Sequence, residues 1–461
     1  MKPTTIANLF SRGTRAARVV LVLAALCACA SPAAAWSNHA LCTWPALAVL
    51  PQVTAAAPVE VERLEDFLAK EAPALVRLLE DEERWARAHV PVYPPRPDAL
   101  AFRTDGATGD ELTRRFVAAV RINPASRLAP YLQLPPGQPA GSRPVLGESD
   151  VTTLTRSETT RANVFVALPP GAKVPVIDVV ATGSDEPDHG FDIGLWEDNG
   201  TAYGRTYGFG KQPFGANPAI EFASQAPLHV GFFHEAAIIY KAAPFLQRTY
   251  PEYRIHLWQT LAAHALRSGH RYWGWRFAGW ALHYIQDLTQ PYHARVLPGV
   301  GVAGMLWINT LDIVGWHAPK TDAIALVTNR HLALENYQLH RIRAAYLRGD
   351  RADAALRALQ DTARDAASPY TDASPRAAIT LQSAGYADAL DRTLEARLPR
   401  KYISEPSYVF GETEPDLDLL AVVAQAGPAA EAAMTDALVR LLGNFGTHTR
   451  AFVRALPDSS R

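Results

Sequence analysis

Apolar residues recur at three- and four-residue steps over two long stretches of this chain. The first runs from Ala40 to His89, with the repeat carried by Leu64, Phe67, Leu68, Leu75, Leu78 and Leu79. The second begins at Ala226, and there the spacing predicts helices over 229–245, 252–268, 272–289, 321–348, 351–366, 374–397, 415–425 and 428–455. Because this period places the apolar side chains on one face of a helix, the sequence predicts an all-α fold.

The region between these stretches is less regular. Prolines at 91–97 end the first helical pattern, a short helix is expected over 109–121, and residues 123–143 are rich in Pro, Gly and Ser. Alternating β-branched residues at 164–167 and 174–180 indicate extended chain. No linker divides the sequence, so we expect one domain over 36–461, with a loop-rich insertion at about 90–185 and a helical C-terminal extension at about 350–461.

The first 35 residues resemble a secretory signal peptide. Arg12, Arg15 and Arg18 precede an apolar run from Val19 to Ala30, and alanines at 33–35 offer a small-residue cleavage site. Cleavage after Ala35 makes Trp36 the new N-terminus and predicts a secreted or periplasmic protein. The alternative is lipoprotein processing at Cys29.

Composition narrows the function classes. Removing residues 1–35 takes away four Lys/Arg and no acidic residue, which leaves 41 basic and 46 acidic residues and a net charge of −5 with histidine neutral. This balance argues against a broad basic surface for nucleic acid, and we expect no stable nucleic-acid partner. Only Cys42 remains after cleavage, so an intrachain disulfide is excluded, and bound metal is another source of stability.

The segment from Trp280 to His293 carries the strongest chemical pattern. His283 and Asp287 are four residues apart and share one helix face, Pro291 ends the helix, and His293 follows at the bend. Imidazoles and a carboxylate that converge at a helix end are zinc ligands by type and spacing. The pair His331 and Glu335 repeats the four-residue step, so the pattern indicates more than one metal ion.

These residues give the chain a resemblance to the zinc-dependent phospholipase C/P1-type nuclease superfamily. The segment His-Tyr-Ile-Gln-Asp-Leu-Thr-Gln-Pro-Tyr-His at 283–293 looks like the central motif of that family, and mature members begin with Trp, as Trp36 would here. The order of Trp36, His39, His234, the 283–293 block and the 331–335 pair is also similar. The resemblance implies an all-helical bundle with three zinc ions in a cleft.

The same resemblance implies a ligand set. One zinc ion would be held by Asp188, His234, His283 and a bridging Asp287, and a second by His293, His331 and Glu335. The third would take the amine and carbonyl of Trp36, His39 and the other oxygen of Asp287. Asp188 would also orient or deprotonate the attacking water, and Asp185 and Asp192 in the same loop compete with Asp188 for these roles.

Other interpretations of these residues exist. The pair His331 and Glu335 would be an ordinary surface pair if it stood alone, and so would His234 with Glu235. The remaining histidines after residue 36 are expected not to bind metal, with His189 the main exception because it follows Asp188: His89, His189, His229, His256, His264, His270, His317, His340 and His448.

The function expected from the resemblance is phospholipase C activity, in which zinc-activated water cleaves a phospholipid to diacylglycerol and a phosphorylated head group. Glu335 at the last position favours the phospholipase branch over the nuclease branch, and the apolar segment 297–316 suits a lid or transient contact with a membrane surface, although a buried loop or short helix also explains it. One alternative is a P1-like single-strand nuclease or 3′-nucleotidase, and another is a non-catalytic zinc-binding module.

Overall fold

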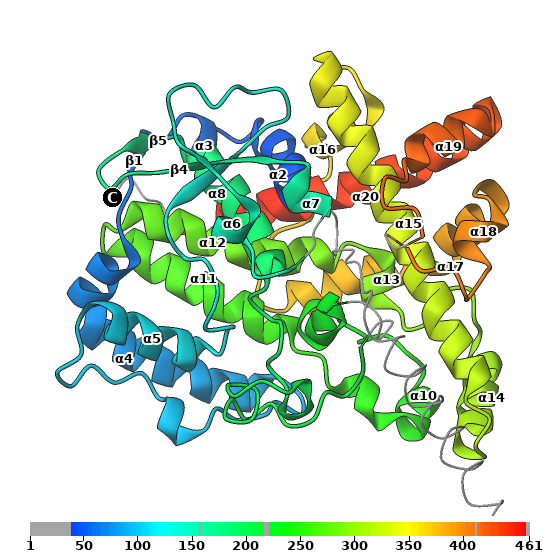
Figure 1. Cartoon of the computed structure of the whole chain (residues 1–461), viewed down its shortest axis with the longest axis horizontal. Coiled ribbons are helices and arrows are strands. Elements are labelled where there is room, and N and C mark those ends of the chain that lie inside the picture. Colours follow the sequence, from blue (N-terminus) through cyan, green and yellow to red (C-terminus); the bar gives the residue numbers. More distant parts are fainter. Residues whose placement is uncertain (1–37, 156–157, 216–220, 411–412, 458–461) are drawn as a thin grey trace, which may run out of the picture.

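The computed structural model describes residues 38–155, 158–215, 221–410 and 413–457. Of the structure, 61% is helix and 3% is strand, which confirms the all-α class (Figure 1). The predicted signal segment, Cys29 and Trp36 lie outside the described residues. None of the described helices combines the length and the apolar character needed to cross a membrane.

Two long helices form the centre of the molecule. Helix α11 (Pro251–Arg267) packs along α12 (Arg271–Asp287), and α8 (Val176–Asp185) covers another side of α12. Sixteen of the seventeen residues of α12 are buried, which is why its sequence is apolar and aromatic around its whole circumference rather than along one stripe.

Glycines allow α8 and α12 to approach closely. A Cβ atom added at Gly279 would lie 2.6 Å from the carbonyl oxygen of Val180 and 2.8 Å from the Cα atom of Gly183. Real Cβ atoms do not approach backbone atoms so closely. The close contact therefore requires glycine at these positions, and it fixes where α8 lies along α12.

Helices from both ends of the chain flank this centre. The first described helix, α2 (His39–Leu47), has all nine residues buried and contacts α8 and the last helix, α20 (Pro428–Ala455). On the other side, α15 (Ala318–Arg348) is the longest of the described helices and crosses the right of Figure 1. Segments distant in sequence thus meet around α12.

Further helices complete the described structure, and α4 is the longest of them. Their bounds are α3 (Pro51–Thr54), α4 (Leu64–His89), α5 (Gly109–Val120), α6 (Glu148–Val151), α7 (Glu158–Arg161), α9 (Ala226–His229), α10 (Ala237–Ala242), α13 (Pro291–Ala294), α14 (Val302–Ile313), α16 (Ala354–Gln360), α17 (Thr380–Arg397), α18 (Arg400–Ile403) and α19 (Leu419–Gln425). Single turns occur at η1 (Asp98–Leu100), η2 (Glu186–His189), η3 (Glu197–Asn199), η4 (Glu221–Gln225), η5 (Pro244–Gln247), η6 (Asp365–Ala367) and η7 (Pro375–Ile379).

Within the described residues, five short strands form two small antiparallel sheets. Strands β1 (Val59–Glu60) and β5 (Lys173–Val174) pair with Val59 opposite Val174. Strand β4 (Val164–Ala167) lies between β2 (Tyr131–Leu134) and β3 (Val145–Leu146), with Tyr131 opposite Ala167. Strand β2 also packs on α8.

Two of the secondary-structure elements predicted from the sequence are wrong. Most of 174–180 belongs to helix α8 rather than to a strand, because Val176, Val179 and Val180 at three- and four-residue steps are all buried. The predicted helix over 229–245 is interrupted: α9 ends at His229, α10 begins at Ala237, and the backbone N–H of Gly231 donates to the carbonyl of His293 instead of to a helical neighbour.

Candidate metal centre

The end of α12 holds the centre of the site. Helix geometry places His283 and Asp287 one turn apart, and both side chains are completely buried. Nδ1 of His283 lies 2.8 Å from the carbonyl oxygen of Ser184 at the end of α8, which leaves Nε2 directed into the site. A backbone carbonyl on one ring nitrogen fixes the orientation of a ligand histidine and keeps the other nitrogen available.

Helix α13 places His293 in the same way. Pro291 begins this short helix, and the side chain of Gln290 caps it by accepting the backbone N–H of Tyr292. Nδ1 of His293 lies 3.0 Å from the carbonyl oxygen of His229, and its Nε2 lies 3.1 Å from Nε2 of His331 on α15.

Three groups of side chains converge here in a way that could hold metal ions. In each, the potential ligand atoms lie within 4.8 Å of one another, and all the residues except His331 are buried. The groups are His39 with His283 and Asp287, Asp188 with His229 and His283, and His293 with His331 and Glu335. Two of the groups share His283, so the first two positions are neighbours.

Asp287 lies between the groups. Its Oδ2 is 2.9 Å from Nδ1 of His229 and 3.4 Å from Nε2 of His283, and its Oδ1 is 3.4 Å from Nε2 of His39. Oδ1 is also 3.7 Å from Nδ1 of His293. The two oxygens thus face different neighbours, which is the placement that a bridging carboxylate requires.

Three buried polar atoms in the cluster make no hydrogen bond to any described residue: Nε2 of His39, Oδ1 of Asp287 and Oε2 of Glu335. Such atoms cost free energy unless something satisfies them. Nitrogen and carboxylate oxygen ligands without cysteine are a donor set that suits divalent zinc. The residues present therefore fit a group of divalent cations.

Burial and neighbouring charge shift the pKa values in the cluster. Burial raises the pKa of Asp188 to about 8 against the opposing charge of His229, and it lowers the pKa of His293 to about 3. Burial alone would also lower the pKa of His39 and His229, but nearby carboxylates raise it. Asp287 raises the pKa of His39 to about 9, and Asp192 together with Asp287 raises that of His229 to about 10. The protons on these groups are those that a bound cation displaces.

His229 occupies the position that the sequence assigned to His234. Nδ1 of His229 lies 3.1 Å from Nε2 of His283, and its Nε2 lies 3.2 Å from Oδ2 of Asp192. Asp192 is itself held by Arg254 at 2.6 Å and by the hydroxyl of Tyr284 at 2.7 Å. A carboxylate behind a histidine fixes which nitrogen faces a metal, so Asp192 would act as a positioning residue for His229.

His234 is placed elsewhere, which corrects the sequence assignment. Its Nε2 lies 3.0 Å from the carbonyl oxygen of Arg376 and 3.1 Å from Oγ1 of Thr380, and it belongs to none of the three groups. The physical reason is the interruption of the predicted helix after His229, so that His234 contacts Arg376 and Thr380 instead of the cluster. The sequence contains no closely spaced partner that would identify His229 as a ligand, because the nearest of its carboxylate partners is 37 residues away.

The aspartates predicted as alternatives for the same ligand role lie at different positions in the site. Asp188 stands beside His229 and His283, and its Oδ1 accepts a hydrogen bond from Nε2 of Gln225 at 2.9 Å. Asp185 accepts the backbone N–H of Ala40 at 3.1 Å, next to His39. Its pKa is raised to about 6 by burial. His189, the expected exception among the other histidines, contacts the hydroxyl of Tyr131 and lies in none of the groups.

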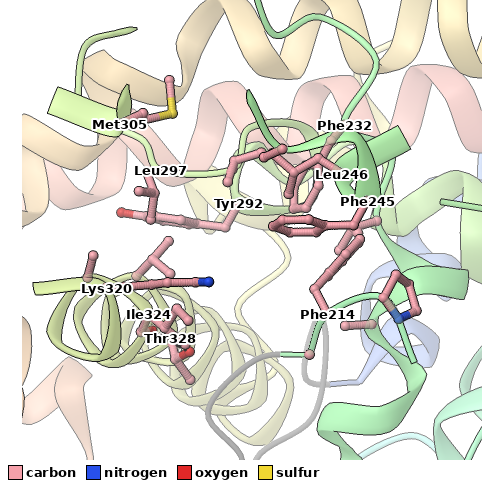
Figure 2. Close-up of a pocket in the computed structure, with 18 of the residues that line it drawn as sticks. Phe214, Phe232, Phe245, Leu246, Tyr292, Leu297, Met305, Lys320, Ile324 and Thr328 are labelled. Atoms are coloured by element: carbon pink, nitrogen blue, oxygen red, sulfur yellow. Dashed lines mark hydrogen bonds between the residues drawn. The ribbon is translucent and has the colours of Figure 1, made fainter. Parts of the chain in front are cut away.

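A pocket of about 480 Å³ adjoins the cluster (Figure 2). His229, His293 and His331 form part of its wall, and most of the remaining lining is apolar and comes from α10, α14, α15 and the segment 213–232. Figure 2 shows Phe232, Phe245 and Leu246 on one side and Leu297 and Met305 on another, with Tyr292 between them. A molecule bound at the metal ligands would therefore have apolar surface beside it.

Comparison with known proteins identifies no relative, since no family model, curated protein or solved structure matches this chain. The family assignment therefore still rests on the resemblance of the motif at 283–293 and of the histidine and carboxylate order.

Proposed function

We propose that this protein is a secreted or periplasmic zinc-dependent phosphodiester hydrolase of the phospholipase C type. The observation that carries the proposal is the arrangement of three groups of buried histidines and carboxylates beside a largely apolar pocket. Cations held by these ligands would polarise a phosphate, and the pocket provides apolar surface for the rest of a lipid.

The chain supplies the following parts of such a reaction. His39, Asp188, His229, His283 and Asp287 would hold two adjacent cations, and His293, His331 and Glu335 a further one; Trp36 remains a predicted ligand of the His39 position. Zinc, when bound, neutralises phosphate oxygens and lowers the pKa of water from about 16 towards 7. His229 keeps its orientation through Asp192, and Glu335 through Gln290, whose Nε2 lies 3.4 Å from it.

Asp188 remains the proposed residue for orienting or deprotonating the water. Of the two carboxylates in the groups that share His283, Asp188 is the more exposed, at 7% against 0% for Asp287. Its raised pKa shows that a proton can reside on this carboxylate when no cation is nearby.

A P1-like nuclease or 3′-nucleotidase is the second candidate. Four aromatic side chains line the pocket and could stack on a base: Phe214, Phe232, Phe245 and Tyr292. The apolar lining favours a lipid, because among the described lining residues only the histidines, Gln225, Tyr292, Asn309, Thr328 and Lys320 carry polar side chains that could read base edges.

The experiment that tests the proposal compares three substrates on the purified mature protein: phosphatidylcholine emulsion, single-stranded DNA and a 3′-nucleotide, each with and without chelator. Chelator-sensitive release of phosphocholine supports the phospholipase. Chelator-sensitive cleavage of DNA or of the nucleotide would transfer the proposal to the nuclease. A zinc-loaded protein that cleaves none of them would identify a non-catalytic zinc module.

A further inference from the structure

An exposed apolar surface lies on the outer side of the pocket wall. It consists of Val302, Trp307 and Ile313 on α14 and of Val314 and Trp316 in the turn that follows; we call it the α14 ridge. Their exposed fractions run from 38% for Val302 to 75% for Ile313. Among the twelve large hydrophobic residues exposed in the described part of the chain, five fall within these fifteen positions.

The segment that carries the ridge holds a single charge, and that charge is paired. Between Val296 and Trp316 the only charged residue is Asp312. Its carboxylate lies 2.7 Å from Nζ of Lys320 and 2.7 Å from Nδ1 of His317. A segment that presents large apolar side chains and a single, paired charge can enter the head-group region of a bilayer at little electrostatic cost.

Helix α14 contributes one of its faces to the pocket and the other to the ridge. Met305, Leu306 and Ile308 of α14 line the pocket, while Trp307 between them points away from it at 62% exposure. Helix α10 packs against α14 and adds Ile238, which is 48% exposed, next to its pocket-lining neighbour Ile239. Figure 1 shows both helices at the periphery of the molecule.

We infer that the α14 ridge docks on a phospholipid bilayer. Trp307 and Trp316 are the side-chain type that concentrates where hydrocarbon meets water, and Ile313 and Val314 between them supply the apolar insertion. A bilayer on this ridge places lipid next to the pocket whose inner end carries the proposed metal ligands. A second copy of the chain bound to the same surface would instead block the access of lipid to the pocket. The inference deepens the proposed function and rests on it only for the identity of the lipid as substrate.

The test is sedimentation of the zinc-loaded protein with sucrose-filled vesicles made of a phosphonate analogue of phosphatidylcholine, in which a carbon replaces the bridging oxygen that a phospholipase C would release. Binding is then measured without turnover. The ridge variant Trp307→Ala/Trp316→Ala is compared with Leu347→Ala/Leu381→Ala, a matched control that removes two apolar side chains exposed at 58% and 54% on other surfaces.

The ridge variant should lose about tenfold or more of its vesicle partition coefficient, since each indole contributes a large part of the buried apolar area. It should keep the wild-type rate on a water-soluble choline phosphodiester, and the control variant should keep both properties. Two results would overturn the inference: wild-type protein that stays in the supernatant, or a ridge variant that sediments like wild type. Light scattering that shows a wild-type dimer and a monomeric ridge variant would assign the surface to a second copy instead.

Failure of the proposed function gives a different result. Protein that hydrolyses neither the emulsion nor the soluble diester, yet sediments through the ridge, would retain the docking surface and lose the phospholipase.

Discussion

Replacing His229 should remove zinc-dependent stability, whereas replacing His234 should not. His229 completes one of the three candidate groups and contacts Asp287 at 2.9 Å. His234 lies five residues further along, half-buried, with partners that belong to no metal group. The variants His229→Gln and His234→Gln therefore form a matched pair in chemistry and in sequence position.

The magnitude follows from linkage between binding and folding. Losing one of three protein ligands should weaken zinc binding at that position by about 100-fold or more, since even residues behind a ligand change affinity by about 10- to 100-fold. With zinc in excess, a 100-fold weaker affinity lowers the free energy of unfolding by about 2.7 kcal/mol. His234→Gln should cost about 1 kcal/mol, the value of a hydrogen bond, equally with zinc and with chelator.

The assay is guanidinium denaturation of wild type and both variants in zinc buffer and in chelator. The quantity compared is the difference in unfolding free energy between the two buffers, because it cancels any effect of a substitution on the metal-free fold. If His229→Gln keeps the wild-type difference, or if His234→Gln loses it, the placement of the metal group at His229 is wrong.

Three further predictions concern the surroundings of the site. Asp192→Asn should lower zinc affinity about 10- to 100-fold, measured by competition with a chromogenic chelator, because Nε2 of His229 loses its carboxylate partner. Gly279→Ala should lower the free energy of unfolding by about 1–3 kcal/mol in denaturant titrations, because its Cβ would strike the backbone of α8. Burial and the charge of Arg364 lower the pKa of His448 to about 4, below its value of 6.5 in the unfolded chain. The unfolded state therefore binds the proton first, and stability falls as the pH drops from 6.5 towards 4, by about 1.4 kcal/mol per pH unit from this group. His448→Gln should reduce that slope by this amount in titrations at pH 5 and 6, and an unchanged slope would contradict the burial argument.

The parts of the site that could be predicted from sequence are those encoded by a single helix turn. His283 with Asp287, and His331 with Glu335, repeat every four residues, so helix geometry alone brings each pair together, and Pro291 marks where the chain turns to present His293. The structure places all five in the three groups.

His229 could not be found in this way. Its carboxylate neighbours, Asp192 and Asp287, are 37 and 58 residues away, and the contact forms only because the chain leaves the helical path after α9. His39 depends likewise on a long-range partner, Gln286, at a separation of 247 residues.

The fold shows the same division between local and long-range information. The predicted range 428–455 coincides with α20, because Pro428 follows Gly427 at its start and its apolar face is continuous. For 174–180, β-branched residues indicated a strand, yet burial against α12 at helical steps decided the outcome. Tertiary packing overrides local preference where a short segment has a large neighbour to cover.

The pocket is walled mainly by helices other than those that carry the central ligands. His283 and Asp287 belong to α12, whereas Ile239, Met305 and Ile324 come from α10, α14 and α15. Substitutions on α10 and α14 can therefore reshape the pocket while the candidate metal ligands on α12 stay in place. Under the proposed function, variants of this chain could change their substrate one wall at a time, and a designer could follow the same route.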